Sequence, residues 1–456
     1  MNLSDTITAI STPIGEGGIS VIRISGGRTF DLIENIFYKS SDRNKKLKIS
    51  DSSSHTIHFG YLFNENNLVD EVLISIFKKP NSYTGEDTIE ISSHGGVLVT
   101  QKILSVILKS GGRLAEPGEF TKRAFLNKRL DLSQAEAVAD LIKAKTDLAL
   151  ESSLKQLEGS LSSYISTVRQ EIIDATSLIE LELDFSEEGL EFVSKEEFKK
   201  KIDSLIEKLN NIISSYISGK IIRDGINLVI TGRTNSGKSS LFNELLKSDR
   251  AIVSEISGTT RDYIQENIIM NGILFNLIDT AGIRESQDLI ETEGIKRSFQ
   301  KIEEADFVLY LIDSSETDKF INKEIEFFKN KFDPKKSLLV FAKNDIKDLK
   351  EKGITISIFN DASLYKLKQK ITNKIKESSV QKSSSEIILT NLRHKICLDN
   401  VILSLKQVVE SIDKKMSGEF ISVDLRNALN YLGEITGEVT NEEILNNIFS
   451  KFCIGK

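Results

Sequence analysis

One short stretch of the chain, Gly232-Arg-Thr-Asn-Ser-Gly-Lys-Ser239, has the residue types and spacing of a loop that binds nucleotide phosphates. It follows an apolar run suited to a buried strand, Ile226 to Ile230, and precedes a helical pattern that begins at Ser240. In that context the backbone N–H groups converge on phosphate oxygens, and the helix N-terminus adds a favourable dipole. Lys238 is expected to reach the β- and γ-phosphates, while the Ser239 hydroxyl ligates magnesium.

Two weaker motifs follow in the order that a GTPase requires. The apolar run Leu274 to Ile278 ends in Asp279-Thr-Ala-Gly282, where the aspartate can hold magnesium through water and the glycine can turn toward a γ-phosphate. Before it lies Gly258-Thr-Thr-Arg-Asp262, in which a threonine hydroxyl can complete the magnesium shell. Taken singly, the first motif is also an ordinary strand-to-turn exit and the second a polar surface turn, so both alternatives stay open.

The motif expected to recognise the base is incomplete. After the apolar run Ser337 to Phe341 comes Ala342-Lys-Asn-Asp345, where GTPases usually carry Asn-Lys-x-Asp. Asp345 can accept both guanine N–H groups, and the stem of Lys343 can pack along the base. Because Ala342 replaces the usual asparagine, and Ser357-Ile358 only weakly resembles the usual Ser-Ala, guanine selectivity is predicted to rest on Asp345, with reduced nucleotide affinity.

The residue that positions the attacking water in Ras-like proteins, a glutamine, is absent. Its place after the Asp-x-x-Gly motif is taken by Ile283, which cannot orient water. The candidates to replace it are Glu291 and a cation held near Asn235. Glu291 can equally belong to a solvated acidic face with Glu285 and Glu293.

Composition limits the remaining classes of function. The chain has 456 residues with 39% hydrophobic and 28% charged side chains, ordinary for a globular protein of about two to four domains. It contains no apolar run long enough to span a membrane and no recognisable secretory signal, and its two cysteines, Cys397 and Cys453, fit a reducing cytoplasm. The net charge of −7 disfavours nucleic-acid binding by the whole-molecule field, so RNA contact would need a local basic patch or a partner.

The elements that must position these residues fall into four regions. Residues 1–119 alternate strand-like runs at 17–24, 72–77 and 88–92 with a helical pattern at 100–109, which predicts an α+β domain. Residues 120–221 and 380–456 are largely helical, whereas strands and helices alternate through 222–379. We therefore predict one helical domain made from both flanks, with the α/β domain inserted between them and a hinge at Ser383 to Ser385. A separate C-terminal helical appendage is the alternative.

Local patterns in the helical part predict one helix start and two apolar faces. A capping box formed by Ser133 and Glu136 is expected to open the first helix. Helical periodicity predicts two apolar faces. The residues assigned to these faces are Leu132, Ala135, Val138, Ala139 and Ile142 in the first, and Leu178, Leu181 and Phe185 in the second.

Longer motifs distributed along nearly the whole chain resemble the MnmE (TrmE) family. Besides the nucleotide motifs with Ile283-Arg-Glu285, the matching segments are Thr12-Pro13 with Gly17-Gly18, Pro80-Asn-Ser-Tyr-Thr-Gly-Glu-Asp87, His94-Gly-Gly96, Glu116-Pro-Gly-Glu-Phe-Thr-Lys-Arg-Ala-Phe-Leu-Asn127, Leu130-Asp-Leu-Ser-Gln-Ala-Glu-Ala137 and Phe452-Cys-Ile-Gly-Lys456.

The resemblance implies a multidomain α/β plus α fold: an N-terminal α+β domain that binds folate and forms a homodimer, a split all-α helical domain, and an inserted Ras-like P-loop GTPase domain. It implies a potassium-dependent GTPase, activated when two G domains meet across the dimer. With the flavoprotein partner MnmG, in a heterotetramer where FAD belongs only to the partner, it would add a carboxymethylaminomethyl group to the wobble uridine of certain tRNAs. The one-carbon source would be 5-formyl- or methylene-tetrahydrofolate.

The same resemblance implies roles around the nucleotide, with Glu291 orienting water and Lys238 as the second catalytic candidate. The implied potassium ligands are the Asn235 side chain, the Ser254 and Ile256 carbonyls, and Thr259 in the same loop. The implied magnesium ligands are Ser239 and Thr260. The full set of expected GTP contacts is Asn235, Ser236, Gly237, Lys238, Ser239, Ser240, Ser254, Glu255, Ile256, Ser257, Gly258, Thr259, Thr260, Asp279, Thr280, Ala281, Gly282, Lys343 and Asp345.

For folate the resemblance points to Arg23, Glu90, Arg129 and Lys456. The cationic groups suit the glutamate carboxylates of a folate, and a carboxylate suits the N–H donors of its pterin. Each residue could also be an ordinary surface charge. Cys453 lies near Lys456 in the sequence and is either close to the one-carbon unit or a small buried thiol.

A basic cluster with interleaved aromatic residues is a candidate RNA contact, or else a solvated helix face. Its members are Lys122, Arg123, Lys128 and Arg129, with Phe120 and Phe125. The partner can instead carry most of the tRNA affinity. Two rival functions remain: a regulatory or ribosome-assembly GTPase that modifies nothing, and a one-carbon folate enzyme whose G domain only regulates it.

Overall fold

The computed structural model describes residues 5–184, 194–249, 265–279, 304–347, 349, 353–379 and 387–456. The chain forms two compact units, each of which is described by itself below. The first comprises Met1–Ala139, Gln156–Glu171 and Leu429–Lys456, and the second Asp140–Lys155 and Ile172–Ala428. This division does not follow the four predicted sequence regions, whose boundaries stay a prediction.

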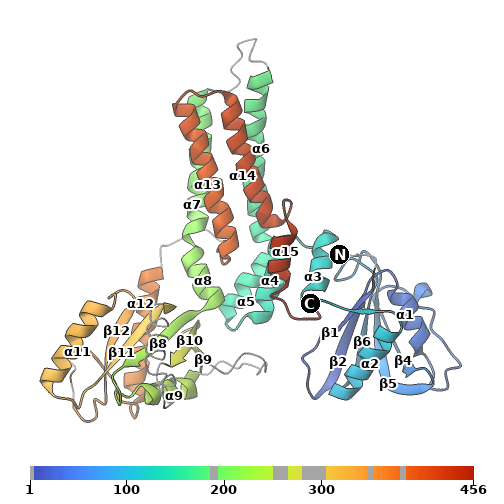
Figure 1. Ribbon diagram of the computed structural model, residues 1–456, viewed down its shortest axis with the longest axis horizontal. Coiled ribbons are helices and arrows are strands. Elements are labelled where there is room, and N and C mark those ends of the chain that lie inside the picture. The colour runs from blue at the N-terminus through green and yellow to red at the C-terminus, as the bar shows by residue number, and fades with distance from the viewer. Residues whose placement is uncertain are drawn as a thin grey trace, which may run out of the picture. The chain divides into compact units, whose positions relative to one another are not determined.

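The first unit contains a mixed sheet with two helices on one face, which confirms the predicted α+β domain (Figure 1). Within the described residues the strands lie in the order β3-β4-β5-β6-β2-β1-β7. Their bounds are β1 Ile7–Ile10, β2 Gly17–Ser25, β3 Phe37–Tyr38, β4 Thr56–Asn64, β5 Asn67–Phe77, β6 Thr88–Gly95 and β7 Arg113–Leu114. The helices are α1 Thr29–Ile36 and α2 Val97–Lys109.

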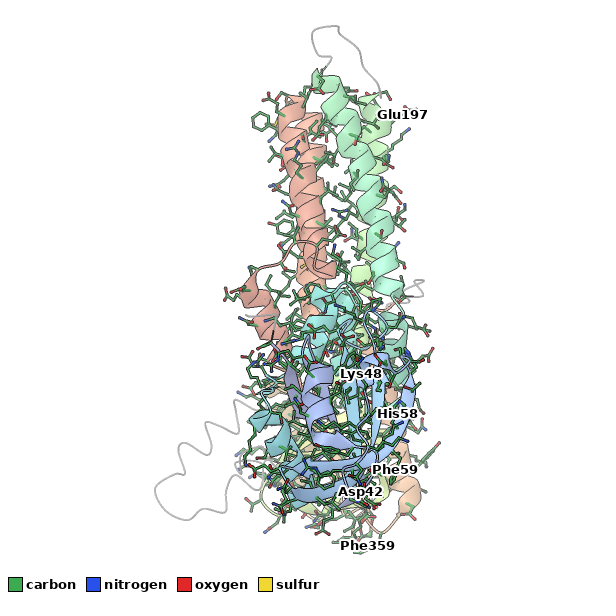
Figure 2. The ribbon with its side chains drawn as sticks, turned by 90° about the vertical axis from the view of Figure 1, so that its right-hand side faces the viewer. Asp42, Lys48, His58, Phe59, Glu197 and Phe359 are labelled. Atoms are coloured by element: carbon green, nitrogen blue, oxygen red, sulfur yellow. The ribbon has the colours of Figure 1, made fainter. Side chains whose placement is uncertain are left out.

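The sheet has one buried and one open face because its central strands alternate apolar residues with period two. On β5, Val72, Ile74 and Ile76 are buried in the core under α1 and α2. Leu73, between them, points to the other face and is exposed, as is its cross-strand partner Phe59 on β4 (Figure 2). The open face therefore carries large exposed apolar side chains.

Helices α3 Glu119–Leu126, α4 Leu132–Lys143 and α15 Glu442–Phe449 complete the first unit, and α5 Asp147–Leu157 follows α4 in the chain. Leu132 and Ala135 pack against Leu445 and Phe449, which joins segments from opposite ends of the sequence.

The helix start predicted at Ser133 was wrong by two residues. The reciprocal capping bonds are made by Asp131 and Gln134. The backbone N–H of Gln134 donates to the Asp131 carboxylate at 2.9 Å, and the backbone N–H of Asp131 donates to the side-chain oxygen of Gln134 at 3.0 Å. Ser133 instead donates its hydroxyl to the Asp131 carboxylate. A capping box is thus present, with aspartate rather than serine at the cap.

In the second unit, helices from both flanks of the α/β domain pack together, which confirms the predicted split helical domain (Figure 1). The helix α7 packs along α13, and the Arg426 guanidinium of α14 binds the Glu180 carboxylate of α6 at 2.6 Å. The helices are α6 Ser160–Asp184, α7 Lys195–Ser214, α8 Tyr216–Asp224, α13 Leu392–Asp413 and α14 Gly418–Thr436. The part of α6 up to Glu171 and the part of α14 from Leu429 belong to the first unit.

The two predicted apolar helix faces are only partly correct. Leu132, Ala135 and Val138 are buried, but Ile142 is 47% exposed and Leu181 is 43% exposed. In α6 the buried positions are Ile172, Ala175 and Ile179 instead. Phe185 and the predicted hinge at Ser383 to Ser385 lie outside the described residues.

The inserted part is the predicted α/β domain. Its described strands lie in the order β13-β12-β11-β8-β10-β9, with every neighbouring pair parallel except β9 and β10. The strands are β8 Ile226–Gly232, β9 Gln265–Met270, β10 Ile273–Asp279, β11 Phe307–Asp313, β12 Ser337–Ala342 and β13 Ile354–Thr355. The helices are α9 Lys238–Asp249, α11 Asp318–Lys331 and α12 Asp361–Ser379.

Helices cover both faces of this sheet, as a doubly wound fold requires. Leu309 and Leu311 of β11 pack in the core that contains the apolar residues of α9 and α12. Tyr310 and Ile312, which alternate with them, face the opposite side, where they pack with Ile321 of α11. None of the helices in the described residues combines the length and the apolarity needed to span a lipid bilayer.

Candidate functional site

The phosphate-binding loop follows the central strand β8, which ends at Gly232, and enters α9 at Lys238, so the predicted strand–loop–helix order is present and the helix begins two residues before the predicted Ser240. Gly232 is required where the loop begins, because a Cβ there would lie 2.3 Å from the Leu311 carbonyl oxygen of the neighbouring strand. Asn235 has a φ of 62°, in the left-handed region that asparagine tolerates better than most residues. The chain can therefore make the tight turn that aims successive N–H groups at one point.

The loop is closed by bonds to a single carbonyl group. The Lys238 ammonium donates to the Arg233 carbonyl oxygen at 2.6 Å, and the Ser236 amide donates to the same oxygen at 3.3 Å. The six predicted GTP contacts of this segment, Asn235 to Ser240, therefore lie together in the loop and the first turn of α9. Ser236 is buried, whereas the side chains of Asn235 and Ser239, which carry oxygen, are exposed. Such oxygen donors suit a hard cation like magnesium or potassium.

The predicted guanine-binding residues follow β12, close to this loop. A Cβ placed on Gly237 would meet the Ala342 methyl group at 3.6 Å, so the two segments are neighbours. The Asp345 carboxylate is exposed at the start of a turn, where it can accept hydrogen bonds from a ligand. The Lys343 ammonium binds the Asp313 carboxylate at 2.5 Å.

The ion pair between Lys343 and Asp313 was not predicted from the sequence. Burial alone would raise the pKa of Asp313, but hydrogen bonds from Lys343 and Ser315 hold it below its ordinary value. Asp313 is the last residue of β11, which pairs with β8. Its place at the end of an apolar strand is the only sequence signal that could have suggested a role at this site.

Several predicted nucleotide-site residues lie outside the described residues. They are Ser254, Glu255, Ile256, Ser257, Gly258, Thr259, Thr260, Thr280, Ala281, Gly282 and Glu291, and the backbone alone is described for Asp279.

A second candidate site lies on the sheet of the first unit. Arg23 on β2 and Glu90 on β6 are direct cross-strand partners, and the Arg23 guanidinium binds the Glu90 carboxylate at 2.8 Å. Two guanidinium groups lie over the Tyr83 ring, that of Arg23 at 5.0 Å and that of Arg129 at 5.3 Å from its centroid. Arg129 also donates to the Tyr83 carbonyl oxygen at 3.0 Å.

The chain's C-terminal segment completes this cluster. The Ser11 hydroxyl donates to the Gly455 carbonyl oxygen at 3.3 Å, which anchors the segment beside the end of β1. Burial lowers the pKa of Lys456, and the nearby positive charge of Arg23 lowers it further. All four predicted folate residues therefore lie in one cluster, and Cys453 beside it is exposed rather than buried.

Sequence reasoning missed two aromatic residues of this cluster. The Tyr83 ring contacts the guanidinium groups of Arg23 and Arg129, and the centroid of the Phe120 ring lies 5.7 Å from the Arg23 guanidinium. Both residues stand in motifs that carried the family resemblance, which was the available signal. Cation–π contacts of this kind hold a guanidinium group in place without using its hydrogen-bond donors.

The cluster has one free donor that fits a folate. The Nη1 atom of Arg23 is buried and has no hydrogen-bond partner within the described ranges. Buried donors normally have a partner, so this atom is suited to an acceptor oxygen or nitrogen of a bound molecule. The cationic side chains around it suit the carboxylates of a folate.

One member of the predicted basic cluster for RNA, Arg123, is not on the surface, whereas Lys128 and Arg129 are exposed. Arg123 is only 1% exposed, and its guanidinium binds the carboxylates of Asp5 at 2.6 Å, Glu86 at 3.2 Å and Glu119 at 3.1 Å. Arg113 adds a second cation to this network through Glu119 and Asp5. Arg123 is therefore a buried structural residue and cannot contact RNA.

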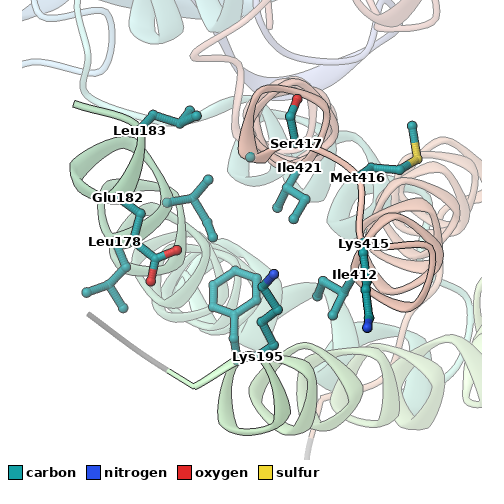
Figure 3. Close-up of a pocket in the computed structure, with 12 residues that line it drawn as sticks. Leu178, Glu182, Leu183, Lys195, Ile412, Lys415, Met416, Ser417 and Ile421 are labelled. Atoms are coloured by element: carbon teal, nitrogen blue, oxygen red, sulfur yellow. The ribbon is translucent and has the colours of Figure 1, made fainter. Parts of the chain in front are cut away.

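A cavity of about 340 Å³ lies at the end of the helical bundle of the second unit (Figure 3). Apolar residues of α6, α7, α13 and α14 line it together with Glu182, Lys195 and Lys415. Its lining includes none of the predicted nucleotide or folate residues. Within the described ranges no group of three histidine, cysteine or acidic residues is placed to hold a metal ion.

Comparisons with known proteins show the family of the chain. A family model described as "GTP-binding protein TrmE N-terminus" matches residues 6–129, and one described as "MnmE helical domain" matches residues 132–453. The "tRNA modification GTPase MnmE" of Lachnoclostridium phytofermentans is 44% identical over 99% of this chain and 100% of its own length. The proteins of that name from Christiangramia forsetii and Thermoanaerobacter pseudethanolicus are 40% and 44% identical, over 100% and 99% of this chain and 100% and 99% of their own lengths. The chain therefore belongs to the MnmE family.

Proposed function

We propose that this protein is a GTP hydrolase that acts in tRNA modification. In the proposal it works with a flavoprotein partner, MnmG, to add a carboxymethylaminomethyl group to the wobble uridine of certain tRNAs. The observation that carries the proposal is a nucleotide loop in its full strand–loop–helix setting, within a chain that matches tRNA modification GTPases along its whole length. The protein is proposed to act in the cytoplasm, where such tRNAs are used.

Hydrolysis is proposed to depend on potassium and on a second G domain. Ile283 takes the place of the usual glutamine, so water must be oriented by another group, for which Glu291 is the candidate. Asn235 presents an exposed side-chain amide in the loop, next to the expected phosphate position. A potassium ion held there with Ser254, Ile256 and Thr259 would supply positive charge beside the phosphates.

The remaining nucleotide residues are proposed to have the roles that their motifs indicate. Lys238, whose ammonium donates to the Arg233 carbonyl oxygen of the same loop, is proposed to bind the β- and γ-phosphates. Ser239 and Thr260 are proposed to ligate magnesium, and Asp345 to accept the guanine N–H groups.

The cluster on the first unit is proposed to bind a one-carbon tetrahydrofolate. The unpaired Nη1 of Arg23 is proposed to donate to the folate, with Arg129 and Lys456 providing charge for its glutamate carboxylates. The remaining acceptor capacity of Glu90 suits the pterin N–H donors.

The open face of the same sheet is proposed to form a homodimer. Phe59 and Leu73 face each other across β4 and β5, and both are exposed. Ser75 pairs with Glu90, and Glu90 with Arg23, so the folate cluster lies on the face that carries these apolar residues. Exposed apolar side chains grouped in this way commonly mark an interface between proteins. Sedimentation of Phe59→Glu should show monomer, whereas Leu403→Glu, an exposed leucine on α13, should leave the dimer intact.

Analysis of tRNA nucleosides tests the proposed function as a whole. Cells that lack the gene should lose the carboxymethylaminomethyl group, wild-type gene should restore it, and Lys238→Ala should not. An unchanged wobble uridine would eliminate the modification role and leave a regulatory GTPase as the function. GTP turnover should be faster in potassium than in sodium, and Asn235→Ala should remove that difference; equal wild-type rates in the two salts would contradict the cation proposal.

A further inference from the structure

A buried carboxylate lies beside the nucleotide loop, and the nucleotide chemistry described so far does not use it. Glu324 of α11 is 2% exposed, and both of its carboxylate oxygens are hydrogen-bonded. Oε1 accepts from the Arg233 guanidinium Nε at 3.1 Å, and Oε2 accepts from the Tyr310 hydroxyl at 2.5 Å. Glutamate is rarely buried this completely unless it is paired.

The two donors come from strands that lie side by side. Tyr310 of β11 pairs in register with Thr231 of β8, two residues before Arg233. Its ring is enclosed by Phe327, Phe328 and Phe332, with ring centroids 5.4 to 6.0 Å away, which leaves its hydroxyl little freedom. The Tyr310 hydroxyl therefore holds one oxygen of the Glu324 carboxylate, and the other oxygen fixes the position of the Arg233 guanidinium.

Arg233 connects this carboxylate to the phosphate-binding lysine. Its main-chain carbonyl accepts from Lys238 at 2.6 Å and from the Ser236 amide at 3.3 Å. If Arg233 moved away, Glu324 would be left as a buried charge with a single neutral donor, which is costly. The arrangement consequently favours one conformation of residue 233, and with it one orientation of the carbonyl that aims Lys238.

We propose that Glu324 and Arg233 are positioning residues for nucleotide binding. Glu324 fixes the Arg233 side chain, and the Arg233 carbonyl in turn orients the Lys238 ammonium toward the phosphates. The guanidinium also neutralises a negative charge that would otherwise lie beside a site for a polyanion. The assignment rests on described residues and on GTP binding alone, so it is independent of the tRNA and folate chemistry.

The test uses the full-length protein, a fluorescent GDP analogue for affinity, and steady-state GTP hydrolysis. Arg233→Ala should weaken GDP binding on the order of tenfold to a hundredfold, because a hydrogen bond between charged groups is lost and a buried carboxylate is left unpaired. Glu324→Gln should weaken it less, since the amide keeps the shape of the carboxylate. In both variants KM for GTP should rise by a larger factor than kcat falls, as expected when the loss of nucleotide binding outweighs the loss of transition-state contact by Lys238.

Two further variants separate positioning from a general loss of stability. Adding Glu324→Gln to Arg233→Ala should restore part of the lost affinity, because the unpaired charge is removed. Glu326→Gln, which makes the same change at an exposed position of α11, should bind GDP like wild type. If Arg233→Ala does not fold, Tyr310→Phe, which removes one donor to Glu324, should raise KM in the same direction. Equal affinities for Glu324→Gln and Glu326→Gln, no recovery in the double variant, or a fall in kcat without a change in KM would each overturn the proposal.

Discussion

Replacing Arg123 by methionine should loosen α3 without disturbing the G domain. The Arg123 guanidinium is 1% exposed and binds carboxylates of three residues, Asp5, Glu86 and Glu119. Breaking a buried ion pair by removing one partner costs about 3–5 kcal/mol. The lower end applies here, because Glu119, the fully buried partner, keeps Arg113 at 2.6 Å, and Asp5 and Glu86 can reach water. We therefore expect a loss of about 3 kcal/mol in the local opening free energy.

Hydrogen exchange in the full-length protein measures this loss directly. A change of about 3 kcal/mol should speed exchange of the α3 amides roughly a hundredfold, since each 1.4 kcal/mol is about a factor of ten. Amides of β8 and α9 in the second unit should exchange as in wild type. Lys128→Met, which removes the same charge from an exposed residue just after α3, serves as the control. Unchanged α3 exchange in Arg123→Met, or equal acceleration in Lys128→Met, would refute the idea that the buried network holds this helix.

Three further results are expected. The hydrogen bond to Asp70 raises the pKa of His94 above its ordinary value, so an NMR titration should show this shift and Asp70→Asn should abolish it. The stability that this pair contributes is fully present below the unfolded-state pKa of about 6.5, and it is lost as pH rises through the folded-state value. Asp345→Asn should weaken GDP binding about a hundredfold and favour xanthine nucleotides, because the amide can donate to the 2-carbonyl of xanthine; unchanged GDP affinity would contradict its assigned role. Tyr83→Leu should weaken tetrahydrofolate binding about tenfold through the loss of two cation–π contacts, with GTP turnover unchanged, and an unaltered folate isotherm would count against the cluster.

The nucleotide loop was accessible from the sequence because all of its parts are local. Strand, glycines, lysine and helix follow one another within Ile226 to Ser240, and the geometry of such a loop depends mainly on backbone conformation. The guanine-binding segment was predicted for the same reason, since Asp345 comes directly after a recognisable buried strand. What stayed hidden was the bond from Lys343 to Asp313, which joins two different strands.

The errors in the helical part arose because periodicity is a local signal. Helical periodicity identifies which residues can share a face, but it cannot decide which of two similar faces will meet a neighbour. Leu181 and Ile142 were placed in the core on periodicity, and both are exposed. Packing against the partner helices determined the face. At the start of α4 the sequence analysis assigned the cap to Ser133, whereas Asp131 forms it.

The sequence alone determined the chemistry available to this protein: a phosphate loop, an aspartate for guanine, and a family resemblance that pointed to Arg23, Glu90, Arg129 and Lys456. Tertiary structure decided which charges are available to a ligand and which are already paired. Arg123 resembled a surface cation and is buried among carboxylates, whereas Arg23 is half-buried and keeps one buried donor, Nη1, without a described partner. The physical reason is that the register of a sheet and the packing of helices bring together residues far apart in the chain, and these partners set the electrostatic environment of each group.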